Sequence, residues 1–152
     1  MNVRLVQFVA LIMAVLALVP SAAHLFELPG KTDLTVTDYY VVQSIYSGWA
    51  LFGAVWIAAL IASAVLAVLV RRQRWPLRLA TMSSLCFVLM FAIFFIWTSP
   101  ANQATANWTS IPANWEVLRA QWEYSHAVNS VIVFAAVCCV YLSAVTWRPS
   151  GG

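Results

Sequence analysis

The chain has 152 residues, of which 63% are hydrophobic and only 9% are charged. Soluble domains carry close to a quarter charged residues, so this composition excludes an ordinary soluble domain and is typical of an integral membrane protein. The formal net charge of +3 does not indicate a nucleic-acid partner, because the basic residues flank apolar segments instead of forming a binding stripe. We therefore expect the lipid bilayer as a partner, and no nucleic acid.

Four apolar segments follow one another along the chain. We expect membrane-spanning helices over about residues 5–26, 39–70, 77–97 and 114–147. Each is long enough, at about 1.5 Å per residue, to cross a hydrocarbon core of about 30 Å. Short links favour antiparallel neighbours, so the predicted fold is all-α. It is a single domain, residues 1–152, built as an antiparallel bundle of four transmembrane helices.

The first segment also has the features of a secretory signal. Arg4 precedes the apolar run 5–19, and Ser21-Ala22-Ala23 is an acceptable cleavage site that would leave His24 as the new N-terminus. We prefer an uncleaved helix, because the apolar run continues through Leu25 and Phe26.

Three local patterns refine the segments and their ends. Small residues early in the second segment, Gly48, Ala50, Gly53 and Ala54, predict close contact with a neighbouring helix. Thr98-Ser99-Pro100 is expected to end the third helix. The connection Leu28-Pro29-Gly30-Lys31 has the composition of a turn.

The basic residues predict the orientation. One set would face a single side of the membrane: Arg4, Arg71, Arg72, Arg74, Arg78 and Arg148. Only Lys31 and Arg119 would face the other side. Under the positive-inside rule both termini are cytoplasmic and both long connections are external. The expected location is a bacterial inner membrane, crossed several times.

The three cysteines, Cys86, Cys138 and Cys139, all lie inside apolar runs. We interpret them as small buried apolar residues, because none lies in an external loop where it could form a stabilising disulfide.

The only two histidines lie at matching depths. His24 is about twenty residues from Arg4 and His126 about twenty from Trp147, which places both about 30 Å above the cytoplasmic boundary. Each has a carboxylate three residues away on the same helix face, Glu27 and Glu123 respectively. Ionisable groups at membrane depth normally face the bundle interior and mark functional sites. We therefore predict an outward-facing His/Glu pocket.

Other polar and aromatic residues fall near the same level. Arg119 shares a face with Glu123 and His126, and Asn102 follows the third helix. The second helix contributes Gln43, Tyr46 and Trp49. Simpler explanations exist for single residues: Glu123 could pair with Arg119 one turn away, and the tryptophans could form an interfacial belt.

Three chemistries suit such a pocket. His24, Glu27, Glu123 and His126 could be metal ligands, as in di-iron helical bundles, although only half the usual carboxylates are present. The two histidines could instead hold a noncovalent haem. A histidine supported by a carboxylate could also act as a general base without any cofactor. A Ser/His/Asp hydrolase is not favoured, because Ser125 and its neighbour His126 point to different parts of the helix.

A sequence pattern extends from the end of the third segment into the fourth. Its parts are Pro100-Ala-Asn102, Asn107-Trp108, Asn114-Trp115 and Leu118-Arg119-Ala-Gln-Trp122-Glu123-Tyr-Ser-His126. This pattern resembles the signature of the anthrone-oxygenase-like membrane family, which includes many bacterial four-helix proteins of unassigned function. Upstream, His24-Leu-Phe-Glu27 and Gln43-Ser-Ile-Tyr46-Ser-Gly-Trp49 are similar to one bacterial branch of that family. Asn129 departs from the family pattern, which places the substrate in doubt.

The resemblance implies oxygenation of a polyphenolic anthrone to an anthraquinone by dioxygen, without metal or flavin. His126 would take the acidic benzylic proton and Glu123 would orient the imidazole. Arg119 or Asn102 would stabilise the enolate. Gln43 would be a polar contact of the substrate. The substrate rings would stack on the aromatic residues of the site, which are Trp108, Trp115, Trp122, Tyr46 and Trp49.

Our leading hypothesis is thus an oxygenase-like membrane oxidoreductase that acts on an apolar aromatic small molecule. The alternative is a non-enzymatic subunit that binds haem or metal, or a scaffold of a larger complex. The cofactor stays open at this point: none, a metal ion or haem.

Overall fold

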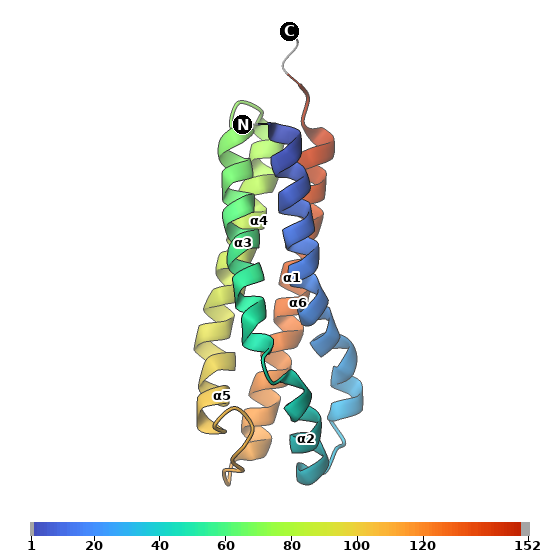
Figure 1. The fold of residues 1–152 in the computed structure, drawn as a ribbon, viewed down its shortest axis with the longest axis vertical. Helices are drawn as coiled ribbons and strands as arrows, with labels where there is room; N and C mark the ends of the chain where they lie inside the picture. The colour runs from blue at the N-terminus through green and yellow to red at the C-terminus, as the bar shows by residue number, and fades with distance from the viewer. Residues whose placement is uncertain (1, 150–152) are drawn as a thin grey trace.

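The computed structural model describes residues 2–149, and this range contains helices and no strand. The longer elements are α1 (Val3–Lys31), α3 (Phe52–Leu69), α4 (Arg74–Ile93) and α6 (Trp115–Thr146) (Figure 1). The shorter ones are α2 (Val36–Gln43), η1 (Ser44–Tyr46), η2 (Trp49–Leu51), η3 (Phe94–Thr98) and α5 (Ser99–Ala104). The prediction of an all-α chain is confirmed.

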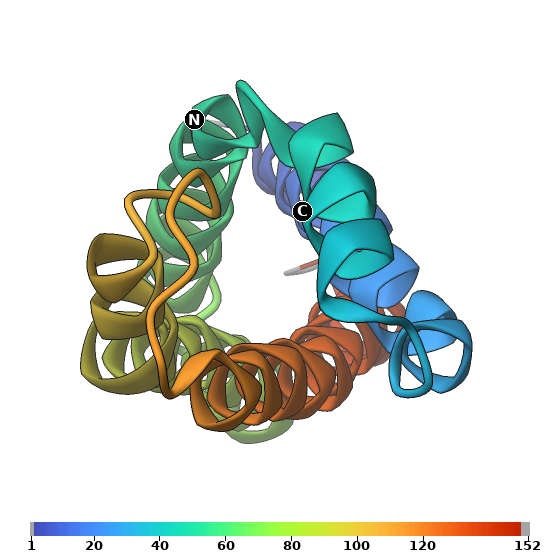
Figure 2. The ribbon, with the colours of Figure 1, turned by 90° about the horizontal axis from the view of Figure 1, so that it is seen from below.

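Four helical stretches are long and apolar enough to cross a membrane: Val3–Lys31, Trp49–Leu69, Arg74–Ala104 and Trp115–Thr146. Around the bundle axis the order is α1, α3, α4 and α6, and α6 closes the ring by packing on α1 (Figure 2). The predicted antiparallel four-helix bundle is therefore confirmed.

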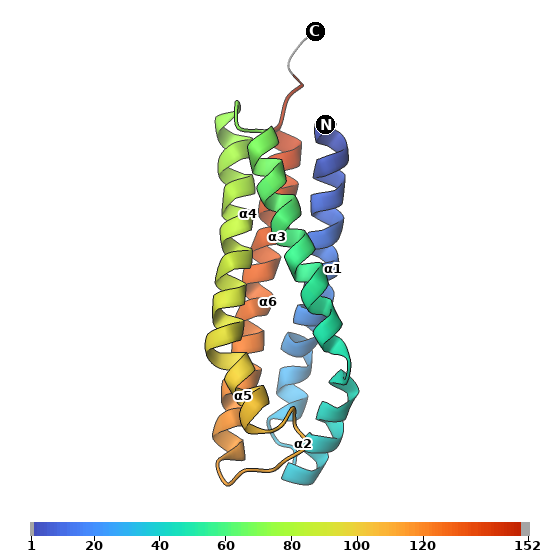
Figure 3. The ribbon, with the colours of Figure 1, turned by 60° about the vertical axis from the view of Figure 1, so that its left-hand side comes forward.

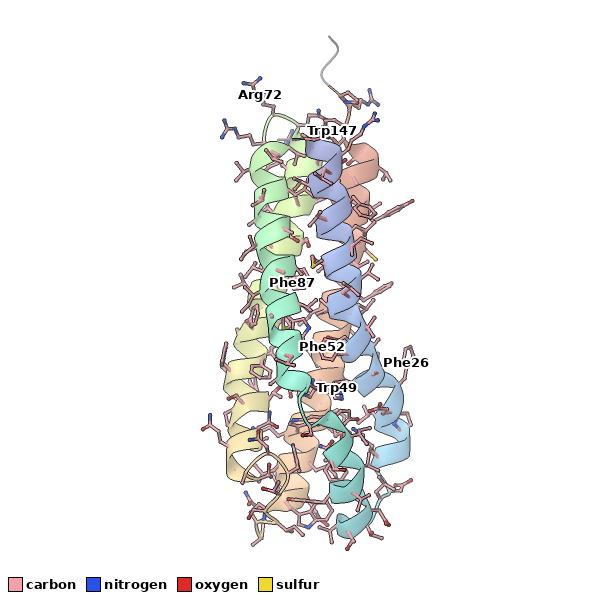
Figure 4. All side chains as sticks on the ribbon, in the orientation of Figure 1. Phe26, Trp49, Phe52, Arg72, Phe87 and Trp147 are labelled. Carbon is pink, nitrogen blue, oxygen red and sulfur yellow. The ribbon has the colours of Figure 1, made fainter. Side chains whose placement is uncertain are left out.

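The start of α1 and the end of α6 lie at the same end of the bundle, beside the turn between α3 and α4 (Figures 1 and 3). Arg72 and Trp147 mark this end, and Trp49 lies toward the other (Figure 4). We call that other end the distal end. It is built from the last turns of α1, from α2, η1, η2 and α5, and from the first turns of α6.

Small residues form much of the core. On α1, Ala10, Ala14 and Ala17 are fully buried, and Ala59 and Ala136 lie opposite them in the same cluster. Such residues let helix backbones approach closely, which is how helices associate in lipid, where apolar burial alone supplies little drive. The outer surface carries large exposed apolar side chains such as Phe26, which points away from the bundle (Figure 4).

The helix predicted over 39–70 is wrong in its continuity. The chain breaks at Ser47 and Gly48, and Gly48 has φ of +86°, a left-handed conformation that glycine adopts without steric cost. The prediction that a neighbouring helix packs closely at Gly48 and Gly53 is also wrong, because a Cβ atom at either position would meet open space. Beyond the break, α2 is displaced from the line of α3 and lies beside the last turns of α1 (Figures 1 and 3).

The third segment continues past its predicted end at Trp97. A π-helical turn, η3, leads directly into α5, and Pro100 lies at the start of α5. Proline lacks an N–H and its ring crowds the carbonyl four residues earlier. The wider π turn, in which the Ser99 N–H donates to the Phe94 carbonyl, is a helical path that accommodates it.

The first helix also extends further than predicted. It continues through Pro20 and Pro29 to Lys31, so Leu28-Pro29-Gly30-Lys31 is helical and not a turn. The extension brings Lys31 onto the bundle as a buried residue. Residues 3–23, which a signal peptidase would remove, are part of this one helix and pack against α3 and α6.

Candidate functional site

The two histidines meet at the distal end, as their matching depths predicted. The ring centroids of His24 on α1 and His126 on α6 are 4.2 Å apart. Only 5% of His24 and 7% of His126 is exposed. Two helices from opposite ends of the sequence therefore place both imidazoles of the chain in direct contact.

Aromatic rings surround this histidine pair. The centroid of His24 lies 4.6 Å from that of Tyr46, 4.9 Å from Trp122 and 5.5 Å from Trp49. Trp122 also lies 4.2 Å from His126. The break at Gly48 allows Tyr46 and Trp49 to face His24 from consecutive short helices. The sequence prediction that these aromatic residues share a level with the histidines agrees with this packing.

Next to the histidines, the Lys31 ammonium group bridges two carboxylates. Its Nζ lies 3.3 Å from Glu27 Oε2 and 3.4 Å from Glu123 Oε1, and it donates to the Tyr46 hydroxyl. Only 3% of Lys31 is exposed. A buried cation is tolerated only when it is paired, and here Glu27 and Glu123 supply the opposite charge. The ammonium also lies 4.3 Å from the Tyr46 ring centroid, within cation–π range.

A second network fixes Glu123. Tyr39 on α2 donates its hydroxyl hydrogen to Glu123 Oε1 at 2.9 Å, and Gln43 Nε2 donates to the Tyr39 hydroxyl oxygen at 2.7 Å. Burial, and then the nearby Glu123 charge, raises the pKa of Tyr39 far above its usual value. Burial and the hydrogen bond to Glu27 likewise raise the pKa of Tyr46. Both hydroxyls therefore stay protonated and act as donors.

Glu123 does not contact the partners that the sequence suggested. Within residues 2–149 no ion pair joins it to Arg119 and no hydrogen bond joins it to His126. Its side chain points inward to Lys31 and Tyr39 instead. The role of orienting His126, which the family resemblance implied, thus has no supporting contact.

Arg119 lies on the outside of this network. Its Nη1 donates to the Leu34 carbonyl at 3.2 Å. The guanidinium carbon lies 4.8 Å from the Trp115 ring centroid and 5.5 Å from that of Tyr39. These contacts tie the α1–α2 connection to α6.

Asn102 positions two tryptophans. Its Oδ1 accepts from the indole N–H of Trp108 at 3.2 Å and of Trp122 at 2.8 Å. Ala106, Asn107 and Trp108 all have positive φ, an unfavourable backbone for residues with a Cβ, and this turn returns Trp108 toward the bundle. Asn102 is therefore a positioning residue for the aromatic wall.

Two further residues of α6 have structural partners. Ser125 shares a hydrogen bond of 2.8 Å with Thr98, which agrees with the expectation that it does not serve His126. Asn129, the departure from the family pattern, donates to the Met90 carbonyl. Its Oδ1 is buried without a partner.

The sequence reasoning missed Lys31 and Tyr39. A signal for Lys31 was present, because His24, Glu27 and Lys31 follow the i, i+3, i+7 spacing of one helix face. Because Pro29 and Gly30 predict a turn, Lys31 was not expected to lie on this helix face. Tyr39 carried no comparable signal, since its position depends on how the break at Gly48 displaces α2 from the line of α3.

The residues as placed do not fit the metal or haem arrangements considered above. Lys31 lies between Glu27 and Glu123, the position that a cation would take. In the described part of the chain, no group of three or more His, Cys, Asp or Glu side chains is arranged to hold a metal ion. A haem iron between two histidines needs each nitrogen about 2 Å from the metal on opposite sides, and rings already in contact leave no space for a porphyrin. The cysteines at 86, 138 and 139 are free and half-buried.

A small pocket opens beside the network, between α1 and α6. Its volume is about 160 Å³, and it is lined by Leu28, Lys31, Thr32, Glu116, Arg119, Ala120, Glu123 and Tyr124. Neither histidine lines it. It reaches the buried network from the side of Lys31 and Glu123.

No family model, no curated protein and no solved structure matches this chain. Fold and site together define a class: an all-helical bundle with four helices able to cross a membrane and a buried cluster of acidic, basic and aromatic groups at the end opposite its termini.

Proposed function

We propose that the protein is a membrane oxidoreductase, similar to the anthrone-oxygenase-like proteins, that acts on an apolar aromatic substrate at the distal end. One observation carries this proposal. The imidazoles of His24 and His126 are in contact, and aromatic side chains surround them. Beside them lies the Lys31 ammonium group, which is paired with Glu27 and Glu123. A buried base next to a fixed cation is suited to removing a proton and stabilising the anion that forms.

In the proposed reaction, His126 takes an acidic proton from the substrate. The negative charge moves to the substrate's carbonyl oxygen, which becomes an enolate oxygen, and the Lys31 ammonium group stabilises it there. Dioxygen then adds to the substrate carbon that lost the proton, and the resulting peroxide takes that proton back from His126. Loss of one water molecule leaves a new carbonyl group, with both electron pairs of the two broken C–H bonds transferred to oxygen.

The remaining residues hold these groups in place. Glu27 and Glu123 hold the Lys31 ammonium group in place, and Tyr39 fixes Glu123. Trp122, held by Asn102, forms a flat apolar wall against both imidazoles. These contacts give Glu123 and Asn102 positioning roles.

Dioxygen uptake by the purified protein in detergent, with a polyphenolic anthrone as substrate, tests the proposal. We expect uptake by the wild type and a decrease in kcat of about 100-fold or more for His126→Ala, the range that a positioned general base contributes. Tyr141→Ala, a truncation of an exposed aromatic residue further along α6, is the matched control and should retain activity. Full activity of folded His126→Ala would contradict the proposal.

A further inference from the structure

The pocket between α1 and α6 has the size of a single aromatic ring. Its volume is about 160 Å³. An apolar cavity of about 150 Å³ in another protein holds one benzene molecule. A three-ring ligand is larger than this space and would extend out of the pocket, which is partly open to the surface. The pocket therefore fits a single ring best.

Its lining combines cations, a buried acceptor and short apolar side chains. Lys31 and Arg119 supply positive charge, which favours the π face of an electron-rich ring and also a phenolic oxygen. Leu28 and Ala120 supply apolar contact. A ring that carries a hydroxyl group matches this mixture better than an apolar hydrocarbon does.

The acceptor is Glu123, which forms part of the pocket wall and is 3% exposed. Its Oε1 already accepts from Tyr39, but its Oε2 is buried and has no hydrogen-bond partner. Leaving a buried carboxylate oxygen unpaired is unfavourable, and a ligand hydroxyl would satisfy it with a charge-assisted hydrogen bond.

We propose that this pocket binds a single phenolic ring, whose hydroxyl group donates to Glu123. Neither histidine lines the pocket, so this site is separate from the proposed reaction centre, and the inference goes beyond the proposed function without depending on it. Bound there, the ring lies beside the Lys31 ammonium group.

Isothermal titration of the purified, detergent-solubilised full chain tests the pocket with three probes: phenol, its methyl ether anisole, and a dihydroxyanthrone. We expect phenol to bind at one site and anisole, which lacks the donor, to bind at least tenfold more weakly. The dihydroxyanthrone should not compete with phenol. Equal binding of phenol and anisole, or no binding of phenol, overturns the inference.

Two variants locate the site. Glu123→Gln removes the charged acceptor and should weaken phenol binding at least tenfold. Ala120→Phe fills the pocket from an exposed position on α6, leaves Glu123 with its partners, and should abolish binding without lowering the melting temperature. Asp33→Asn, an exposed acid outside the pocket, is the control and should bind like the wild type. Unchanged phenol binding by Ala120→Phe overturns the inference.

The outcomes separate this inference from the proposed function. Phenol binding of the expected pattern without any dioxygen uptake supports the inference and contradicts the proposed function. Dioxygen uptake with the dihydroxyanthrone, and no binding of phenol, does the reverse.

Discussion

Lys31 is the residue on which the distal end depends most. Its ammonium group contacts Glu27, Glu123 and Tyr46, and it is almost fully buried. Breaking a buried ion pair by removing one partner leaves an uncompensated charge, which costs more than the pair contributed. The same side chain stabilises the substrate anion in the proposed mechanism.

Lys31→Met should therefore destabilise the protein by about 3–5 kcal/mol, because the buried carboxylate of Glu123 is left without a cation, while Glu27 is 35% exposed and loses less. Denaturation of the purified protein in detergent measures this. The double variant Lys31→Met/Glu123→Gln removes one of the two orphaned charges and should recover part of the loss. A Lys31→Met variant as stable as the wild type would show that the bridge does not form.

The tyrosines predict a response to alkaline pH. Burial raises the pKa of Tyr39 and Tyr46 above the usual value of about 10. A folded pKa raised in this way contributes stability that is complete below about pH 10 and is lost as pH rises toward the folded value. The free energy of unfolding should thus fall above about pH 10, and less steeply for Tyr39→Phe.

Ultraviolet absorbance of tyrosinate provides the check. Of the five tyrosines, Tyr39 and Tyr46 should ionise only as the protein unfolds. Ionisation of all five at the ordinary pKa in the folded protein would contradict the two hydrogen-bond networks.

At the scale of elements, Gly48 creates the geometry of the site. Its left-handed backbone separates η1 from η2 and lets Tyr46 and Trp49 both face His24. Gly53, five residues later, lies in α3 and has equal free space around its Cβ position. The two glycines form a matched pair that differs in backbone conformation.

Gly48→Ala should destabilise the protein by about 1 kcal/mol or more, because an L-residue is strained at positive φ. Gly53→Ala should be neutral or stabilise by up to about 1 kcal/mol, because alanine suits a helix interior better. Chemical denaturation of both variants gives the comparison. Equal effects at the two positions would contradict the helix break.

Sequence-based prediction of the helices was most accurate where long apolar runs define them. Long apolar runs bounded by arginines predicted all four spanning helices, and counting residues predicted that His24 and His126 share a depth. Breaks and extensions were harder to predict. Pro29 and Pro100 both usually end helices, yet one lies within the last turns of α1 and the other follows a π turn. Tertiary packing decides such cases, and local propensity does not.

The same limit applies to the site. The Glu/His spacing predicted that His24 and Glu27 share one helix face, and their side chains lie 4.0 Å apart. It did not predict that Glu123 would face Lys31 and Tyr39 and leave Arg119 outside. The direction of the Glu123 side chain depends on Tyr39 of α2, and the position of α2 depends on the break at Gly48.

At the scale of the whole molecule, one end of the bundle predicts the orientation of the chain in the membrane. The turn between α3 and α4 carries Arg71 and Arg72 and lies beside the start of α1 and the end of α6 (Figures 1 and 4). From the positive-inside rule we predict that this end is cytoplasmic and that the distal end faces outward.

Cysteine labelling tests this orientation. In a variant without the three native cysteines, Ser110→Cys at the distal end should react with a membrane-impermeant thiol reagent applied to intact bacterial cells. Arg72→Cys should react only after the membrane is opened. The reverse pattern would place the histidine cluster on the cytoplasmic side.

The candidate site depends on contact between α1 and α6 at the distal end, and the two histidines allow a direct test. Because the chain has only two histidines, protein labelled in histidine alone gives one possible through-space correlation between imidazole rings in solid-state NMR. We predict this cross-peak for the protein in lipid bilayers, retained on dilution with unlabelled protein and absent in His24→Ala. Two assigned histidine signals from the folded protein with no correlation between them would contradict the site.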